Sequence, residues 1–151
     1  MSRIILLDAG PLGLLTQPRP TAISLQCRQW AQQLRASGAL LLVAEIADYE
    51  VRRELTRAGK RTGIQRLDAL QREFGYVSLT TATMRQAAAY WAQLRQQGRP
   101  TAPDLALDGD VILAVQAALL IGAGHSATVA TTNVGHLTRL VPADLWQNIT
   151  D

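Results

Sequence analysis

The chain has 151 residues, a hydrophobic fraction of 48% and a formal net charge of +3. This length and composition exclude a disordered chain and are sufficient for a sizeable buried core. The single cysteine, Cys27, excludes an internal disulfide framework, and we expect it as a buried or half-buried helix residue. No apolar stretch approaches the ~20 residues of a membrane span. We therefore expect a cytoplasmic protein without a membrane partner, forming one domain over residues 1–151.

Short apolar runs alternate with longer segments in which apolar residues recur at helical spacing. In chain order we predict strands over residues 3–8, 39–44 and 76–79, a strand within 126–133 and a last strand in the tail 145–151. A helical turn is expected at Pro11, and helices are expected over residues 21–38, 45–58, 62–74, 80–98 and 108–124. Thr21 should cap the helix over 21–38 and Gly38 should end it. Strands that are separated by helices in this way favour parallel pairing.

The predicted fold class is α/β, as a three-layer α/β/α sandwich with a mainly parallel central sheet. Strands that are apolar on both faces need helices on both sides of the sheet. The helix over residues 108–124 is apolar on most of its surface, so we expect it near the centre. The segment 98–107 carries two prolines and is a predicted loop, in which Asp104 is expected to be solvated.

Acidic and amide side chains gather where such a sheet places its chemistry. They follow the first, second and fourth strands or open the apolar helix: Asp8, Glu45, Glu50, Asn133, Asp108 and Asp110. Because sites in parallel sheets lie outside the carboxyl ends of the strands, we expect several of these side chains to meet. Clustered carboxylates repel unless protons or a cation neutralise them, and Mg²⁺ or Mn²⁺ prefers oxygen ligands. Such an ion suits phosphodiester hydrolysis.

Each acid also has a purely structural interpretation. Asp8 and Asp108 could each cap the helix that follows, and Asp110 could interact favourably with the dipole of its helix from the first turn. Glu50 could pair with Arg53 at helical spacing. These interpretations stay open beside the metal-site hypothesis.

Four segments, in order, resemble the motifs of the PIN-domain family, which includes the toxin ribonucleases of bacterial VapBC-type pairs. They are ILLDAGPLGLL with Asp8, EIADYEVRREL with Glu50, LDGDVILAVQAAL with Asp110, and TVATTNVGHL with Thr131 and Asn133. The resemblance extends over nearly the whole chain. It implies an α/β/α sandwich with an RNA-cleaving site that depends on Mg²⁺ or Mn²⁺. It also implies a homodimer as a common assembly, and a protein antitoxin that covers the acidic pocket.

The resemblance assigns roles to the clustered side chains. Asp8, Glu50, Asp108 and Asp110 would be the metal ligands, with Asn133 completing the shell directly or through water. The catalytic set would then be Asp8, Glu50, Asp110 and Asn133. A water activated by the ion would attack phosphorus in line, so no serine or histidine nucleophile is required.

The chain departs from the family pattern at several positions. Asn133 stands where many active members carry Asp, so it brings no charge to a second cation. Gly10 follows Ala9 where a hydroxyl or amide is common, which removes a hydrogen bond from the surroundings of the site. Leu137 stands where an aromatic residue is common. Thr131 is retained, and we expect it to orient the site.

Arginine supplies nearly all of the positive charge, and its planar fork suits phosphate recognition. The candidates for contact with an RNA backbone are Arg52 and Arg53, with the further basic residues Arg57, Lys60, Arg61 and Arg66. Each of them also fits an ordinary solvated helix surface.

Three functions therefore follow from the sequence. The first is a metal-dependent endoribonuclease acting as the toxin of a toxin–antitoxin pair. The second is a regulatory module that binds RNA or protein with a weakened site, because of Asn133 and Gly10. The third is an aspartate-based phosphatase or receiver domain, which would need a lysine after a later strand, whereas Lys60 lies between two predicted helices.

Overall fold

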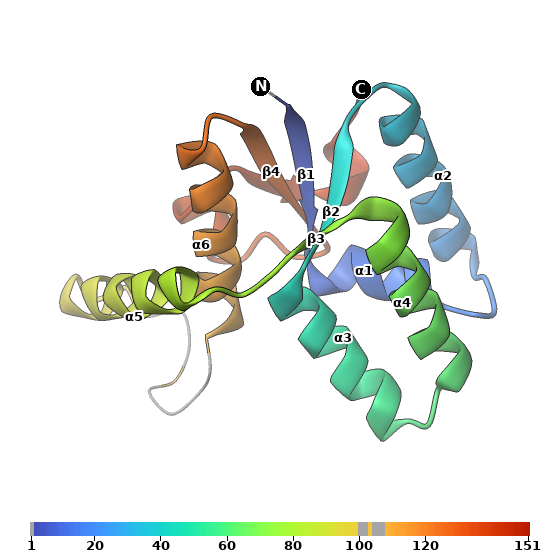
Figure 1. Cartoon of the computed structure of the whole chain (residues 1–151), viewed down its shortest axis with the longest axis horizontal. Helices are drawn as coiled ribbons and strands as arrows, with labels where there is room; N and C mark the ends of the chain where they lie inside the picture. Colours follow the sequence, from blue (N-terminus) through green and yellow to red (C-terminus); the bar gives the residue numbers. More distant parts are fainter. Residues whose placement is uncertain (1, 100–102, 104–107) are drawn as a thin grey trace.

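A parallel sheet of five strands in the order β3-β2-β1-β4-β5 forms the centre of the computed structural model, which describes residues 2–99, 103 and 108–151 (Figure 1). The strands are β1 (Arg3–Leu7), β2 (Leu40–Ala44), β3 (Tyr76–Val77), β4 (Ser126–Thr131) and β5 (Ala143–Leu145). Every pairing between neighbouring strands is parallel. The predicted α/β class with a mainly parallel sheet is confirmed.

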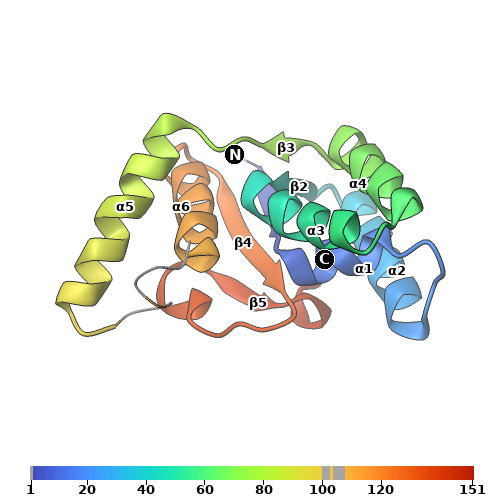
Figure 2. The same cartoon turned by 90° about the horizontal axis from the view of Figure 1, so that it is seen from below.

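Helices cover both faces of the sheet, which gives the three predicted layers. The helices are α1 (Ala9–Thr16), α2 (Ala22–Ala36), α3 (Glu45–Arg57), α4 (Arg61–Phe74), α5 (Thr81–Gln96) and α6 (Gly109–Gly122), with 3₁₀ turns η1 (Leu137–Arg139) and η2 (Trp146–Asn148). Seen from below, α1 to α4 gather on one side of the sheet and α6 lies on the other, with α5 outside it (Figure 2). The first half of α6 is buried, as predicted for a central helix.

Strand β1 is the most deeply buried element and determines where the site lies. Residues 4–7 are almost fully buried, because β1 pairs with β2 on one side and β4 on the other. Its last residue, Leu7, is opposite Val43 of β2 and Ala130 of β4. The residues that follow these three strands therefore emerge together at one edge of the sheet.

Local sequence signals explain most of the helix boundaries. Thr21 caps α2 through a capping box with Ser24, in which each side chain accepts a hydrogen bond from the other residue's backbone N–H. Beyond the end of α2, Gly38 has φ of +97°, a conformation that glycine adopts without strain. Thr80 caps α5 by accepting from the Thr83 N–H.

Two predicted strands differ from the structure. The strand expected over residues 76–79 ends at Val77, because the Leu79 N–H donates to the Glu45 carboxylate instead of joining the sheet. The tail strand expected over 145–151 lies earlier, at β5. The chain turns at Trp146, which packs edge-on against Trp30 with ring centroids 5.6 Å apart.

Other expectations from the sequence are settled in the same structure. Cys27 is fully buried on α2, and burial raises the pKa of its thiol to about 12, so it is an inert core residue. Most of the predicted loop 98–107, Asp104 included, lies outside the described residues. Within the described part of the chain, no helix combines the length and the apolar character needed to cross a bilayer.

The packing of α4 against the sheet yields a stability prediction. Leu67 is fully buried, whereas Leu25 on α2 is 52% exposed. We expect Leu67→Ala to lower the free energy of unfolding by about 2–5 kcal/mol, because it leaves a cavity. Leu25→Ala makes the same helical substitution at the surface and should change it by no more than about 0.5 kcal/mol. Urea unfolding of the two variants measures the difference, and equal losses would contradict the assigned core.

Candidate metal centre

Asp8 lies one residue beyond the central strand and is held there by three hydrogen bonds. Its backbone N–H donates to the Ala130 carbonyl at 3.0 Å, which extends the pairing of β1 with β4. Its Oδ1 accepts from the Ala9 N–H at 2.7 Å and so caps α1. Its Oδ2 accepts from the Thr131 hydroxyl at 2.7 Å. The capping interpretation is confirmed, and the carboxylate is held at the carboxyl edge of the sheet.

Glu50 reaches this edge from the second turn of α3. Its carboxylate lies directly against Gly109 at the start of α6, where an added Cβ would lie only 2.6 Å from Glu50 Oε1. Burial raises the pKa of Glu50, and repulsion from Asp8 and Asp110 adds to this effect, while the attraction of Arg53 opposes it. The structure thus brings Glu50 into the electrostatic neighbourhood of both aspartates.

Asp108 and Asp110 approach the same edge from the N-terminus of α6. Asp108 is buried and caps the helix, since its Oδ1 accepts from the Val111 N–H at 3.1 Å. Asp110 lies in the first turn of the helix. Burial raises its pKa, and repulsion from Asp8 and Asp108 raises it further. The capping alternative for Asp108 is confirmed without removing the residue from the acidic group.

The four carboxylates are close enough to repel one another, but they do not form a complete set of metal ligands in this arrangement. Among the described residues, no group of three or more His, Cys, Asp or Glu side chains is arranged to hold a metal ion. Carboxylate oxygens of Asp8 accept hydrogen bonds from the Ala9 N–H and the Thr131 hydroxyl, and Asp108 accepts one from the Val111 N–H. Hard cations such as Mg²⁺ retain several waters, so this arrangement suits an ion bound partly through water.

Asn133 is linked to the acids through its backbone. The Thr131 hydroxyl, which donates to Asp8, also accepts from the Asn133 N–H at 3.1 Å. The Asn133 side-chain oxygen instead accepts from the Gly135 N–H at 3.0 Å, a local turn. The predicted orienting role of Thr131 therefore has a geometric basis. The amide oxygen of Asn133 accepts a hydrogen bond in this turn, and its role as a ligand, directly or through water, stays a prediction.

Gly10 has an interpretation that the sequence did not reveal. A Cβ at Gly10 would lie only 2.2 Å from Oγ1 of Thr132, so the Thr132 side chain fills the space that a side chain at residue 10 would need. The hydroxyl of Thr132, which directly follows β4, thus occupies the space that a side chain at position 10 would need. A glycine directly after Ala9 gives no sign of a partner more than one hundred residues away.

A groove begins at Glu50 and runs along the space between α1 and α3. Its volume is about 1030 Å³. Residues from α1, α3 and the two connecting segments line it, including Gly10, Leu14, Gln17, Arg19, Glu50, Arg53, Leu55, Arg57 and Lys60. The groove is acidic at the Glu50 end and basic towards Lys60, so a polyanion could lie in it with one phosphate next to the acids.

The two predicted backbone-contact arginines differ in their surroundings. Arg53 lines the groove, and its guanidinium lies over the ring of Tyr49, with the Cζ atom 5.4 Å from the ring centroid. Arg52 forms ion pairs with Asp48 at 3.0 Å and Asp68 at 2.8 Å, which join α3 to α4. The geometry therefore favours Arg53 as a substrate contact and assigns Arg52 to helix packing.

Comparison with solved structures identifies this fold. A chain of VapBC2 from Rickettsia felis, solved bound to a DNA fragment from their promoter, matches with a TM-score of 0.70 and 15% identity, over 95% of this chain and 98% of that chain. A chain of VapBC-1 from nontypeable Haemophilus influenzae matches at 0.66 and 19%, over 96% and 99%. A chain of FitAcB from Neisseria gonorrhoeae matches at 0.59 and 17%, over 96% and 99%.

These similarities define the class of fold. No protein-family model matches the sequence, and no curated protein matches it either. The structural matches confirm the resemblance to the PIN-domain fold, which the sequence indicated through its four motifs. At identities below 20% they establish the architecture, and the chemistry has to be inferred from the residues of this chain.

The raised pKa of Asp110 predicts how stability depends on pH. A carboxyl whose pKa is higher in the folded protein binds more protons there than in the unfolded chain, so stability falls as pH rises through this window. Without added metal, we expect Asp110→Asn to unfold at a higher temperature than the wild type at pH 7. This advantage should shrink as the pH falls towards about 4, because the carboxyl takes up a proton in the folded protein and then in the unfolded chain.

Thermal unfolding from pH 4 to pH 8 in EDTA measures this dependence. Glu54→Gln is the matched control, because Glu54 lies on exposed α3 surface and pairs with Arg57. Glu54→Gln should change the free energy of unfolding by no more than about 0.5 kcal/mol at every pH. An Asp110→Asn variant that is destabilised at pH 7 would show that the charge of Asp110 is satisfied in the folded protein.

The contact between Gly109 and Glu50 predicts a second effect. A methyl group at Gly109 would force the Glu50 carboxylate away, whereas Gly122, at the other end of α6, has no heavy atom within 4 Å of its added Cβ. Gly122→Ala should therefore be neutral or stabilising by up to about 1 kcal/mol. We expect Gly109→Ala to abolish any stabilisation by Mn²⁺, measured as the shift in Tm, while Gly122→Ala retains it.

Proposed function

We propose that the protein is an endoribonuclease that depends on Mg²⁺ or Mn²⁺ and acts in the cytoplasm as the toxin of a toxin–antitoxin pair. The observation that carries this proposal is the convergence of Asp8, Glu50 and Asp110 at the carboxyl end of the central strand. Asp8 follows β1, Glu50 lies on α3 and Asp110 lies in the first turn of α6. Burial raises the pKa of Glu50 and of Asp110, and repulsion from Asp8 raises both further. A cation would relieve that repulsion.

The residues at this edge fit a hard divalent cation. The donors are carboxylate oxygens of Asp8, Glu50, Asp108 and Asp110. Burial raises the pKa values of Glu50 and Asp110, and repulsion from Asp8 raises both further. The glycine at 109 leaves room for the Glu50 carboxylate. We assign these four acids as ligands, directly or through water. When bound, the ion would supply a Lewis acid for phosphate and lower the pKa of a water molecule.

The remaining side chains of the site position these acids. Thr131 donates to Asp8 and accepts from the Asn133 backbone, which fixes the Asp8 carboxylate relative to the end of β4. Asn133 is assigned a catalytic contribution through the turn that it stabilises, and any contact with the ion would be made through water. Protons released in the reaction would leave through solvent at the open mouth of the groove.

The groove supplies the surface for RNA. Arg53, Arg57 and Lys60 line it beyond Glu50, and their charges would neutralise backbone phosphates without reading the bases. A protein antitoxin would act by occupying the same groove and covering the acids. The solved VapBC and FitAcB structures with this fold support such a partner. A homodimer is proposed from the same resemblance.

A second function is favoured by one specific observation. The Asn133 amide oxygen is engaged in a turn, and the described acids form no group of three that could directly hold a metal. A protein that binds RNA or a partner without cutting it would show these same features. It would differ from the enzyme in giving no cleavage products under saturating Mn²⁺.

The decisive variant is Asp8→Asn, which keeps the shape of the side chain and removes its charge. Mn²⁺ at one hundred times its Kd should stabilise the wild type by about 2.7 kcal/mol, and Asp8→Asn should lose this gain. RNA cleavage in Mn²⁺ should fall at least about 100-fold, as expected when a directly acting group is removed. Asp151→Asn, at the exposed C-terminus, is the matched control. Cleavage that persists in Asp8→Asn would remove the proposed mechanism.

A further inference from the structure

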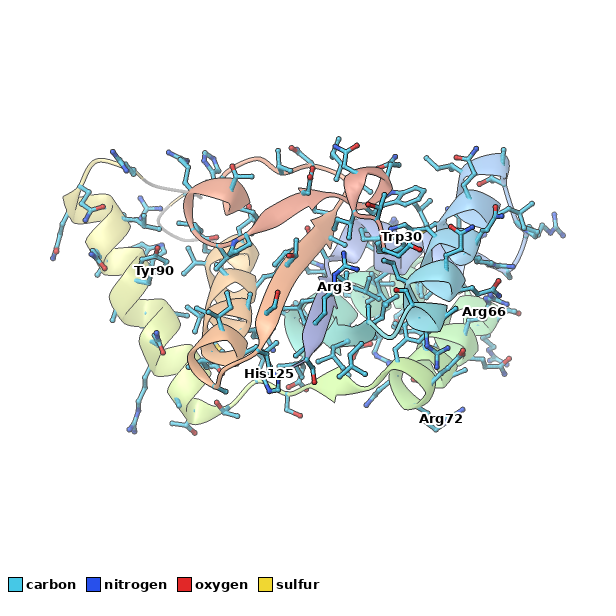
Figure 3. All side chains as sticks on the ribbon, turned by 90° about the horizontal axis from the view of Figure 1, so that it is seen from above. Arg3, Trp30, Arg66, Arg72, Tyr90 and His125 are labelled. Carbon is cyan, nitrogen blue, oxygen red and sulfur yellow. The ribbon has the colours of Figure 1, made fainter. Side chains whose placement is uncertain are left out.

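Two arginines from different helices converge on the end of α1 without a carboxylate between them. Arg28 of α2 donates through Nη2 to the Gln17 carbonyl, and Arg66 of α4 donates through Nη2 to the Leu15 carbonyl at 3.4 Å. Figure 3 shows Arg66 where α4 faces α2. We call Arg28 and Arg66 the arginine pair.

The arginine pair carries more positive charge than its surroundings neutralise. The C-terminus of α1 has no basic residue of its own and offers about half of one negative charge. The ion pairs of the described residues involve Arg35, Arg52 and Arg57, and none involves the arginine pair. Burial lowers the pKa of Arg66, and repulsion from Arg28 lowers it further, which shows that the two charges act on each other.

Each of the two guanidinium groups also has one N–H group, at Nε, without a hydrogen-bond partner. The Nε atoms of Arg28 and Arg66 are buried and have no hydrogen-bond partner, and both residues are half-buried. A buried N–H without a partner is unfavourable, which disfavours the present arrangement of the two guanidinium groups and favours one in which they turn towards a ligand that accepts several hydrogen bonds. Phosphate matches this requirement, because it is anionic and its oxygens accept from a planar guanidinium fork.

The position of the arginine pair relates it to the acidic site. Gln17, whose carbonyl binds Arg28, also lines the groove that begins at Glu50. Helix α1 has 8 residues, so at about 1.5 Å per residue its two ends lie about 12 Å apart. Asp8 caps the first end and the arginine pair lies at the other. A single RNA strand that follows α1 would place one phosphate at the acids and a later one at the arginine pair.

We propose that Arg28 and Arg66 form a second phosphate-binding subsite for RNA, beside the groove and at the end of α1 opposite Asp8. This inference rests on the proposed function for its ligand, an RNA backbone, and not for the existence of an anion site. The subsite would bind RNA without sequence preference and fix the direction in which the strand lies over the acids. Its ligand is a backbone phosphate, and an acidic segment of a protein partner is the alternative that the test excludes or reveals.

The test measures binding in EDTA, so that cleavage does not interfere. A labelled uridine decamer is titrated by fluorescence anisotropy against wild type, Arg28→Gln, Arg66→Gln and the double variant at several salt concentrations. The slope of log K against log salt should become shallower by about 0.7 for each lost phosphate contact. Arg72→Gln, an exposed α4 residue labelled in Figure 3, is the control and should leave the slope unchanged.

Further variants separate phosphate binding from a structural role in capping α1. Arg28→Lys and Arg66→Lys retain the charge and should keep the wild-type salt slope, whereas the Gln variants should not. Thermal unfolding identifies variants that remain folded at the assay temperature. Wild-type affinity and slope in the folded Gln variants would overturn the proposal, and would leave α1 capping or a protein partner as the role of the pair.

The same experiments distinguish this inference from the proposed function. If the wild type binds RNA through the arginine pair but gives no products in Mn²⁺, the nuclease assignment fails and the subsite stands. If the wild type cleaves RNA and the Gln variants bind it unchanged, only the subsite is lost. Failure of the wild type to bind the decamer at low salt would overturn the subsite as well.

Discussion

Repulsion between carboxylates at the end of a buried strand is the constraint around which this structure is built. Asp8 follows four almost fully buried residues of β1, and its charge lies close to those of Glu50 and Asp110. Hydrogen bonds from the Ala9 N–H and the Thr131 hydroxyl stabilise Asp8 there. They do not cancel its effect on the other two acids. The remaining repulsion supports the proposed binding of a cation at this edge, and the partial positive charge at the N-termini of α1 and α6 offsets part of it.

Much of the fold follows from patterns that are local in the sequence. Apolar runs such as residues 39–44 identify β2, and cap residues such as Thr21 set helix boundaries to within one or two positions. What the patterns missed depended on distant partners. The strand at Tyr76–Val77 ends early because the Leu79 N–H donates a hydrogen bond to the Glu45 carboxylate. The tail turns at Trp146, whose ring packs against Trp30. No window of sequence contains both members of either pair.

In the candidate site as well, some features could be predicted from the sequence and others could not. That Asp8, Glu50 and Asp110 would meet was predictable, because parallel strands deliver their ends to one edge. The orientation of each side chain was not. Asn133 turns its oxygen to Gly135, Arg52 is held between Asp48 and Asp68, and Thr132 occupies the space above Gly10. These outcomes depend on which side chains the fold places next to Asn133, Arg52 and Gly10, and residue type alone does not specify those neighbours.

The Glu45 carboxylate, which the family resemblance set aside in favour of Glu50, has a consequence of its own. By binding the Leu79 N–H it limits β3 to two residues, and the opposite edge strand, β5, has only three. Exposed edges of a sheet present unpaired backbone groups that can add strands from other molecules. Short edge strands offer too little length for such pairing to extend. By keeping β3 short, the Glu45 carboxylate thus also disfavours the addition of a further strand at that edge of the sheet.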